Sequence, residues 1–139
     1  MTDVSLTLEA GEWNGIFDLT ISDMHNNIAI KPSLSKGVNK VDLKLELPNK
    51  LIFELNGKNN ETDTLVDTLS GQVLRDKYIR VTEFIVDQKP FDPNRIAQMF
   101  TLLTEHNETV YSSYWGFNGT VELDMPYKSS LEYHLSNLI

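Results

Sequence analysis

Apolar and polar residues alternate with a period of two along much of this chain. The alternation runs through Val4, Leu6 and Leu8, and it returns over residues 17–21 and 41–47 and again from residue 51. Because successive side chains of a β-strand point to opposite faces, each run predicts a strand with one buried and one mainly exposed face. Turn residues separate the runs. The pattern predicts an all-β fold, an antiparallel β-sandwich of jelly-roll type, which forms a single domain over residues 1–139.

Two local signals refine the strands. Residues 77–87 form the longest strand candidate, and their apolar phase changes near Thr82 and Glu83, which predicts a β-bulge or a change of environment. The Leu-Pro-Asn-Lys step at residues 47–50 predicts a tight connection between antiparallel neighbours.

The last third of the chain mixes helical and β signals. Asp92-Pro93 is typical of a helix start, and Ile96 begins an apolar spacing that also fits a longer helix. The β-rich residues that follow favour a helical turn at 93–97 and then a hairpin. A final strand is expected over residues 120–124. The helical spacing of Leu131, Leu135 and Leu138 predicts a short C-terminal helix packed on the sandwich.

Composition excludes several classes of function. The chain has 20 acidic and 12 basic residues among 139, a formal charge of -8, and no cysteine. An acidic surface argues against nucleic-acid and anionic-membrane partners, which require clustered Lys or Arg. The absence of cysteine removes disulfides, thiol catalysis and Cys-ligated metals.

Catalytic motifs are missing, which predicts that the protein is not an enzyme. His25, His106 and His134 are widely separated and form no metal-binding pair with each other or with a glutamate. The sequence has no Gly-x-Ser-x-Gly elbow and no phosphate-binding glycine loop. Two carboxylates at the spacing of a glycosidase will arise by chance in so acidic a chain.

A carboxylate-rich segment has two interpretations. Asp63, Asp67 and Asp76 lie among Asn, Thr and Gly residues. Such a segment is typical of a solvated loop in which Asp and Asn side chains accept hydrogen bonds from nearby backbone amides. The same side chains also supply the oxygen ligands that Ca²⁺ requires, so calcium is a candidate cofactor that would order the loop.

Aromatic residues give a second candidate site. Tyr111, Tyr114, Trp115 and Phe117 lie close together in the sequence, and Trp13 lies elsewhere. These rings fit three roles: packing in the core, contact with a protein partner, or a flat platform on which a sugar ring stacks.

Residues 51–57, 63–67 and 76–81 resemble the calcium-dependent xylan-binding modules and the related β-sandwich domains of tailed-phage and marine-virus structural proteins. Asn56 matches an Asn and Asp76 an acidic residue of that pattern. Gly57 stands where the second calcium-ligating Asp is expected, and residues 58–75 look like an insertion, in which Asp63 and Asp67 would replace the lost ligand. The resemblance implies a jelly-roll sandwich and, as a calcium-dependent carbohydrate-binding module, calcium at Asn56, Asp63, Asp67 and Asp76.

The same resemblance implies a role in a virus particle. Small modules of this kind occur as tail, fibre or head-surface components of tailed bacteriophages, which fits a chain without a signal peptide, a membrane-spanning segment or a catalytic motif. The leading expectation is a non-catalytic structural protein that is made in the host cytoplasm and incorporated into the virion. Its partners would be other virion proteins or copies of itself, in a homo-oligomer. The alternatives are the carbohydrate-binding module and, last, a small hydrolase.

Overall fold

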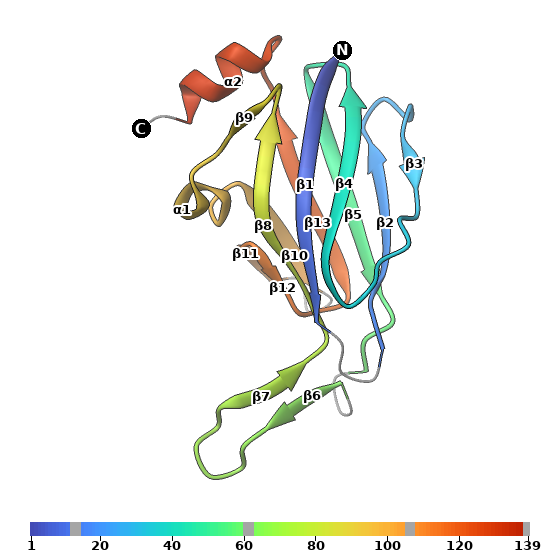
Figure 1. The fold of residues 1–139 in the computed structure, drawn as a ribbon, viewed down its shortest axis with the longest axis vertical. Helices are drawn as coiled ribbons and strands as arrows, with labels where there is room; N and C mark the ends of the chain where they lie inside the picture. The colour runs from blue at the N-terminus through green and yellow to red at the C-terminus, as the bar shows by residue number, and fades with distance from the viewer. Residues whose placement is uncertain (12–14, 60–62, 105–107, 138–139) are drawn as a thin grey trace.

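Two antiparallel β-sheets pack face to face in a jelly-roll sandwich (Figure 1). The computed structural model describes residues 1–11, 15–59, 63–104 and 108–137. The first sheet has the order β12 (Tyr114–Trp115), β8 (Tyr78–Val86), β1 (Thr2–Gly11) and β4 (Gly37–Leu45), and β9 (Lys89–Pro90) pairs with β8. The second has the order β11 (Thr109–Tyr111), β10 (Phe100–Thr104), β13 (Gly119–Met125), β5 (Asn49–Asn56), β2 (Asp18–Asp23) and β3 (Ala29–Ile30).

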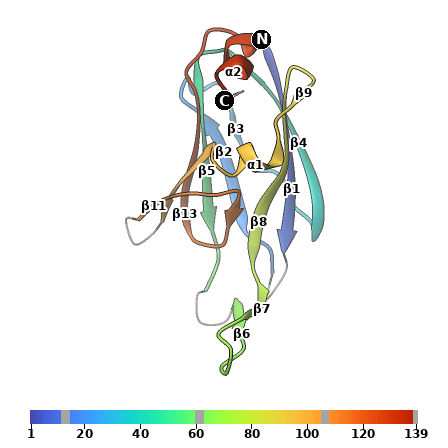
Figure 2. The same ribbon diagram turned by 90° about the vertical axis from the view of Figure 1, so that its left-hand side faces the viewer.

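The core lies between these two layers, which are seen edge-on in Figure 2. The predicted alternation decides which side chains enter the core. Val4, Leu6 and Leu8 point inward from β1, while Ser5 and Thr7 between them point outward. The inward side chains of both sheets are the apolar ones, and their removal from water is the main force that holds the layers together. The fold class predicted from the sequence is therefore confirmed.

Opposite ends of the sandwich carry different elements (Figure 1). The helix α2 (Ser130–Ser136) closes one end, where its Tyr133 is buried against Phe84 and Phe91. At the other end, β6 (Thr64–Val66) and β7 (Val73–Asp76) form a separate two-stranded hairpin that projects from the body. Only Lys77 separates β7 from β8, so the hairpin is almost a continuation of the first sheet.

Several local predictions are confirmed. The register between β1 and β8 shifts at Thr7 and Leu8, opposite Thr82, where the sequence predicts a bulge. The helical turn exists as α1 (Pro93–Ile96), capped by the Asp92 side chain, and the hairpin of β10 and β11 follows it. Neither helix of the described chain has the length and apolar character that a bilayer-spanning helix requires.

The prediction for residues 47–50 is wrong in one respect. This step does not join paired neighbours, because β4 pairs with β1 in the first sheet, whereas β5 pairs with β13 and β2 in the second. The chain crosses from one layer to the other here. The alternation on each side of the step shows only which face of each strand is buried. Two strands that pair in one sheet and two strands that face each other across the core have the same pattern.

Candidate functional site

A cluster of charged and aromatic side chains lies where the β6–β7 hairpin joins the sandwich. Asp76, the last residue of β7, is its centre. The Asp76 carboxylate accepts hydrogen bonds from the Lys58 ammonium, from the Thr64 hydroxyl at 2.7 Å, and from the Tyr114 hydroxyl. Thr64 is placed by the hairpin, since it pairs with Asp76 across β6 and β7. These contacts join the hairpin to β12 and to the connection after β5.

Hydrogen bonds fix both the side chain and the backbone of Lys58. Its side chain is 3% exposed, and its ammonium also donates to the carbonyl oxygen of Gly116 at 2.8 Å. Its backbone is fixed by the Asn118 carboxamide, which accepts from the Lys58 amide at 2.9 Å and donates to the Lys58 carbonyl at 2.7 Å. Gly116 leaves room for this arrangement, because a Cβ atom there would lie 3.1 Å from the Asp76 carboxylate.

A second buried ion pair lies beside the first. The Lys77 ammonium is 3.0 Å from the Asp63 carboxylate, and both side chains are 6% exposed. Lys77 also donates to the carbonyl oxygen of Gly57 at 2.7 Å, and Asp63 accepts from the backbone amide of Asn59 at 2.8 Å. The pair therefore ties the start of β8 to the connection that follows β5.

The four calcium ligands predicted from the sequence do not converge. Asn56 ends β5 and is exposed. Asp67 lies in the hairpin turn, three residues after Thr64, which pairs with Asp76. At the rise of a β-strand, this places Asp67 about 10 Å from Asp76 along the hairpin. Backbone hydrogen bonds from Leu69 and Ser70 lower the pKa of Asp67, so this residue has the turn role of the alternative interpretation.

The two remaining candidates, Asp63 and Asp76, do come to the same end of the sandwich, but each faces a lysine. In the part of the chain that the structure describes, no group of three or more carboxylates or histidines is placed to hold a metal ion. Calcium requires six to eight oxygen ligands with net negative charge. The described residues do not fit it, because the charge of both buried carboxylates is already compensated by an ammonium group.

An aromatic pair covers the same end of the first sheet. The rings of Tyr78 and Tyr114 are stacked, with their centroids 4.8 Å apart and their planes inclined by 21°. The register of β8 and β12 sets this contact, because Tyr114 pairs with Arg80 and so lies beside Tyr78. Gly11 on β1 makes the space for Tyr78, since a Cβ atom at Gly11 would lie 2.1 Å from its ring.

Both phenol groups are anchored by carboxylates. The Tyr78 hydroxyl donates to Glu9, which also accepts from the Arg80 guanidinium at 2.8 Å. The hydrogen bond from Tyr78 is the main cause that lowers the pKa of Glu9. Burial, and then the hydrogen bond to Asp76, raise the pKa of Tyr114 far above its ordinary value. The two rings are therefore neutral and rigidly positioned at physiological pH, although Tyr114 is 41% exposed.

The other aromatic candidates are not part of this surface. Trp115 is completely buried, where it packs against Phe53 and Phe100, so its predicted contact role is wrong and the core role is correct. Phe117 is half-buried against the core. Tyr111 is exposed, but it belongs to β11 at the edge of the other sheet. Trp13 lies outside the described residues.

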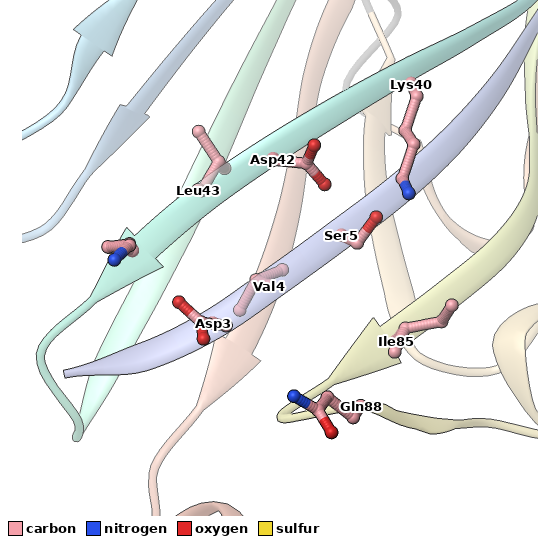
Figure 3. Close-up of a pocket in the computed structure, with 9 residues that line it drawn as sticks. Asp3, Val4, Ser5, Lys40, Asp42, Leu43, Ile85 and Gln88 are labelled. Atoms are coloured by element: carbon pink, nitrogen blue, oxygen red, sulfur yellow. The ribbon is translucent and has the colours of Figure 1, made fainter.

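A groove lies on the outer face of the first sheet, toward the opposite end of β1 from the tyrosine pair. It has a volume of about 520 Å³. Figure 3 shows Lys40 and Asp42 of β4 beside Ser5 of β1, with Ile85 and Gln88 on the side of β8. Asp3 and Lys44 complete the charged lining, so two carboxylates balance two ammonium groups. Ser5 Oγ is buried and has no hydrogen-bond partner among the described residues.

Sequence reasoning missed Glu9, Tyr78 and Arg80. The alternation in β1 and β8 does assign these side chains to the outer faces of their strands. Only the pairing of the two strands, Glu9 with Arg80 and Gly11 with Tyr78, brings them together. Lys58 and Lys77 were missed because a lysine side chain is normally exposed.

Comparison with known proteins bears on the fold. No family model and no curated protein matches the sequence. The structure is similar to the selenomethionine form of vCBM60, solved in work on a circular permutation that links two families of calcium-dependent carbohydrate-binding modules. The TM-score is 0.54 at 9% identity, over 89% of this chain and 91% of that one. It is also similar to vCBM60 in complex with galactobiose, with a TM-score of 0.51 at 8% identity, over 88% of this chain and 97% of that one. The chain thus shares the β-sandwich fold of these carbohydrate-binding modules.

Proposed function

We propose that this chain is a non-catalytic carbohydrate-binding module whose ligand lies on the outer face of the β12–β8–β1–β4 sheet. The observation that carries the proposal is the stacked pair of Tyr78, which is half-buried, and Tyr114, which is 41% exposed, on that face. A flat aromatic ring offers an apolar surface to the C–H groups of a sugar, and its fixed orientation reduces the entropy lost on binding.

Polar groups beside the rings suit the hydroxyl groups of a sugar. Glu9 and Arg80 are hydrogen-bonded to each other, and their side chains are 27% and 48% exposed. A carboxylate accepts and a guanidinium donates hydrogen bonds, and each group presents two parallel bonding positions. Adjacent hydroxyl groups of one sugar ring have the matching geometry. The tyrosines would set the plane of the ring, and Glu9 with Arg80 would read its hydroxyl groups.

The groove indicates the kind of glycan. Glu9 and Ser5 lie on the same face of β1, about 13 Å apart along the strand. A ligand that contacts both the tyrosine pair and the groove must therefore be an oligosaccharide rather than a single sugar. The lining of two lysines and two aspartates has no net charge, which favours a neutral chain over a polyanion. Ser5 Oγ would gain a partner from a ligand hydroxyl.

The structural comparisons support this function over the virion role that the sequence led us to expect. Both similar structures are of a carbohydrate-binding module, and one of them contains galactobiose. Galactobiose is the ligand in the structure of that module. For this chain it indicates the class of compound to test first, a neutral oligosaccharide.

A glycan array tests the proposal. The purified wild-type chain should bind at least one group of neutral oligosaccharides, and Tyr114→Ala should lose that signal. Tyr111→Ala is the matched control, because Tyr111 is 66% exposed but lies at the edge of the other sheet. Absence of binding by the wild type, or equal loss in both variants, would count against the proposal.

A second candidate function is protein–protein contact as a structural component of a tailed-phage virion. It is favoured by the β6–β7 hairpin, which projects from the sandwich with four large apolar side chains exposed: Leu65 at 40%, Val66 at 43%, Leu69 at 97% and Val73 at 53%. Exposed apolar groups on a protruding arm are typical of an interaction surface.

Light scattering coupled to size-exclusion chromatography tests this second function. An oligomer of the wild type that dissociates in the variant Val66→Ser/Leu69→Ser would support it, and mass spectrometry of virions from the source would locate the chain there. A monomeric wild type that is absent from virions would exclude it.

A further inference from the structure

We infer that the ammonium groups of Lys58 and Lys77 take the place of a structural metal ion at the base of the β6–β7 hairpin, so that this chain folds and binds its ligand without calcium. The statement about ligand binding rests on the proposed function. The statement about folding stands independently of it.

The first argument is the set of atoms around each ammonium group. Lys58 contacts the carboxylate of Asp76 and the carbonyl oxygen of Gly116. Lys77 contacts the carboxylate of Asp63 and the carbonyl oxygen of Gly57. Carboxylate and backbone carbonyl oxygens are the ligands that Ca²⁺ uses in proteins. In this chain the same types of oxygen surround a cation that is covalently part of the protein.

The second argument is what the two lysines connect. Through Asp76 and Gly116, Lys58 joins the β6–β7 hairpin to the connection between β12 and β13. Through Asp63 and Gly57, Lys77 joins the start of β8 to the connection between β5 and β6. A structural metal ion stabilises a protein by the same means, since it ties together loops that are distant in the sequence.

The third argument concerns exclusion of a metal. The side chains of Lys58 and Lys77 are 3% and 6% exposed, so neither ammonium group can turn into solvent without opening the cluster. A divalent cation beside Asp76 or Asp63 would lie next to a buried positive charge. Repulsion between like charges in a poorly solvated site, together with the loss of a buried ion pair, makes this arrangement strongly unfavourable.

The experiment compares metal dependence and lysine dependence in the full chain. Thermal unfolding of the wild type should give the same Tm after treatment with EDTA and in excess CaCl₂, and titration calorimetry with CaCl₂ should show no saturable heat. Lys58→Met and Lys77→Met should each lower the Tm by roughly 10 °C, with or without calcium, because each removes the positive charge that compensates a carboxylate in a poorly solvated site. Lys44→Met is the control, since Lys44 is exposed on the outer face of β4.

Two results would overturn the inference: a rise in the wild-type Tm with calcium that EDTA reverses, or lysine variants at 58 and 77 that are as stable as Lys44→Met. If either variant does not fold, the wild-type measurements still decide the matter.

The glycan measurement separates this inference from the proposed function. Binding that EDTA does not change supports both. Binding that requires calcium overturns the inference and leaves the carbohydrate-binding function standing. No binding in either condition removes the proposed function, whereas the Tm measurements still test the role of the lysines in folding.

Discussion

The ring of Tyr78 stacks on the ring of Tyr114 at a centroid distance of 4.8 Å, although the two residues lie on different strands of the first sheet. Each hydroxyl donates to a different carboxylate, Glu9 for Tyr78 and Asp76 for Tyr114. The pair therefore links the outer face of the sheet to the buried lysine cluster beneath the hairpin. The Tyr114 hydroxyl thus joins the flat surface proposed for the ligand to the Lys58–Asp76 ion pair.

The first prediction concerns the ring of Tyr114. Tyr114→Ala should weaken binding of the glycan identified on the array at least about fivefold, because stacking on an aromatic ring contributes about 1 kcal/mol beyond burial. Tyr114→Phe should retain most of the affinity, since it keeps the ring and loses only the hydrogen bond to Asp76. Titration calorimetry measures both constants. Equal losses in the two variants would mean that the hydroxyl, and not the ring, binds the ligand.

The second prediction concerns the space under Tyr78. Gly11→Ala should destabilise the protein by about 1–3 kcal/mol, because the new Cβ atom would overlap the Tyr78 ring. In a Tyr78→Ala background the same change should cost far less, since the overlapping ring is gone. Urea unfolding of the two single variants and the double variant gives the coupling between the residues. A cost of Gly11→Ala that does not change with the background would contradict this explanation.

The third prediction separates two aromatic residues that are neighbours in the sequence. Trp115→Ala should cost about 3–5 kcal/mol of unfolding free energy, because Trp115 fills the core between Phe53 and Phe100. Tyr111→Ala should change it by less than about 0.5 kcal/mol, since Tyr111 is 66% exposed. Chemical denaturation measures both. Similar costs would show that the burial assigned to these two residues is incorrect.

The fourth prediction is a loss of stability in acid. Burial raises the pKa of Asp23, but hydrogen bonds from the Ile28 and Asn27 amides and from Asn49 outweigh it, so the net pKa lies below the ordinary 3.8. Because the folded state favours the ionised form, this contribution is complete above about pH 4 and is lost as the pH falls through the folded-state pKa. The pKa of Glu9 is also lowered from its ordinary 4.5, so its contribution to stability is lost in acid in the same way.

The measurement for this prediction is the midpoint of urea unfolding at a series of pH values. It should be constant from about pH 6 to pH 5 and then fall steadily below about pH 4. Asp23→Asn, which cannot ionise, should show a shallower decline. A midpoint that does not change down to about pH 3 would contradict the sign of these pKa shifts.

Much of the sandwich could be predicted because alternation reports burial directly. Val4, Leu6 and Leu8 follow the two-residue period of a strand, and all are buried. The bulge at Thr82 was visible for the same reason, as a change in the phase of that period. The period does not tell which strands pair, and so it gave the wrong partner for the strand that ends before Pro48.

The site was less accessible to sequence reasoning, because it depends on contacts between distant segments. Lys58 and Asp76 meet only because the hairpin folds back on the end of β5 and β12 packs beside it. The strand β12 has two residues, too few to show an alternation, so the sequence could not reveal that Tyr114 faces outward and Trp115 inward. The resemblance to calcium-dependent modules drew attention to Asp63 and Asp76, but it did not indicate that each carboxylate would face a lysine.

The most direct test of the account is an NMR titration of the labelled full chain with the oligosaccharide selected on the array. The account predicts chemical-shift changes at Tyr78, Tyr114, Arg80 and Glu9 that extend to Ser5 and Ile85 as the oligosaccharide lengthens, both with EDTA and with calcium. Changes confined to the β10–β13–β5–β2 sheet, or no change with any ligand, would contradict it.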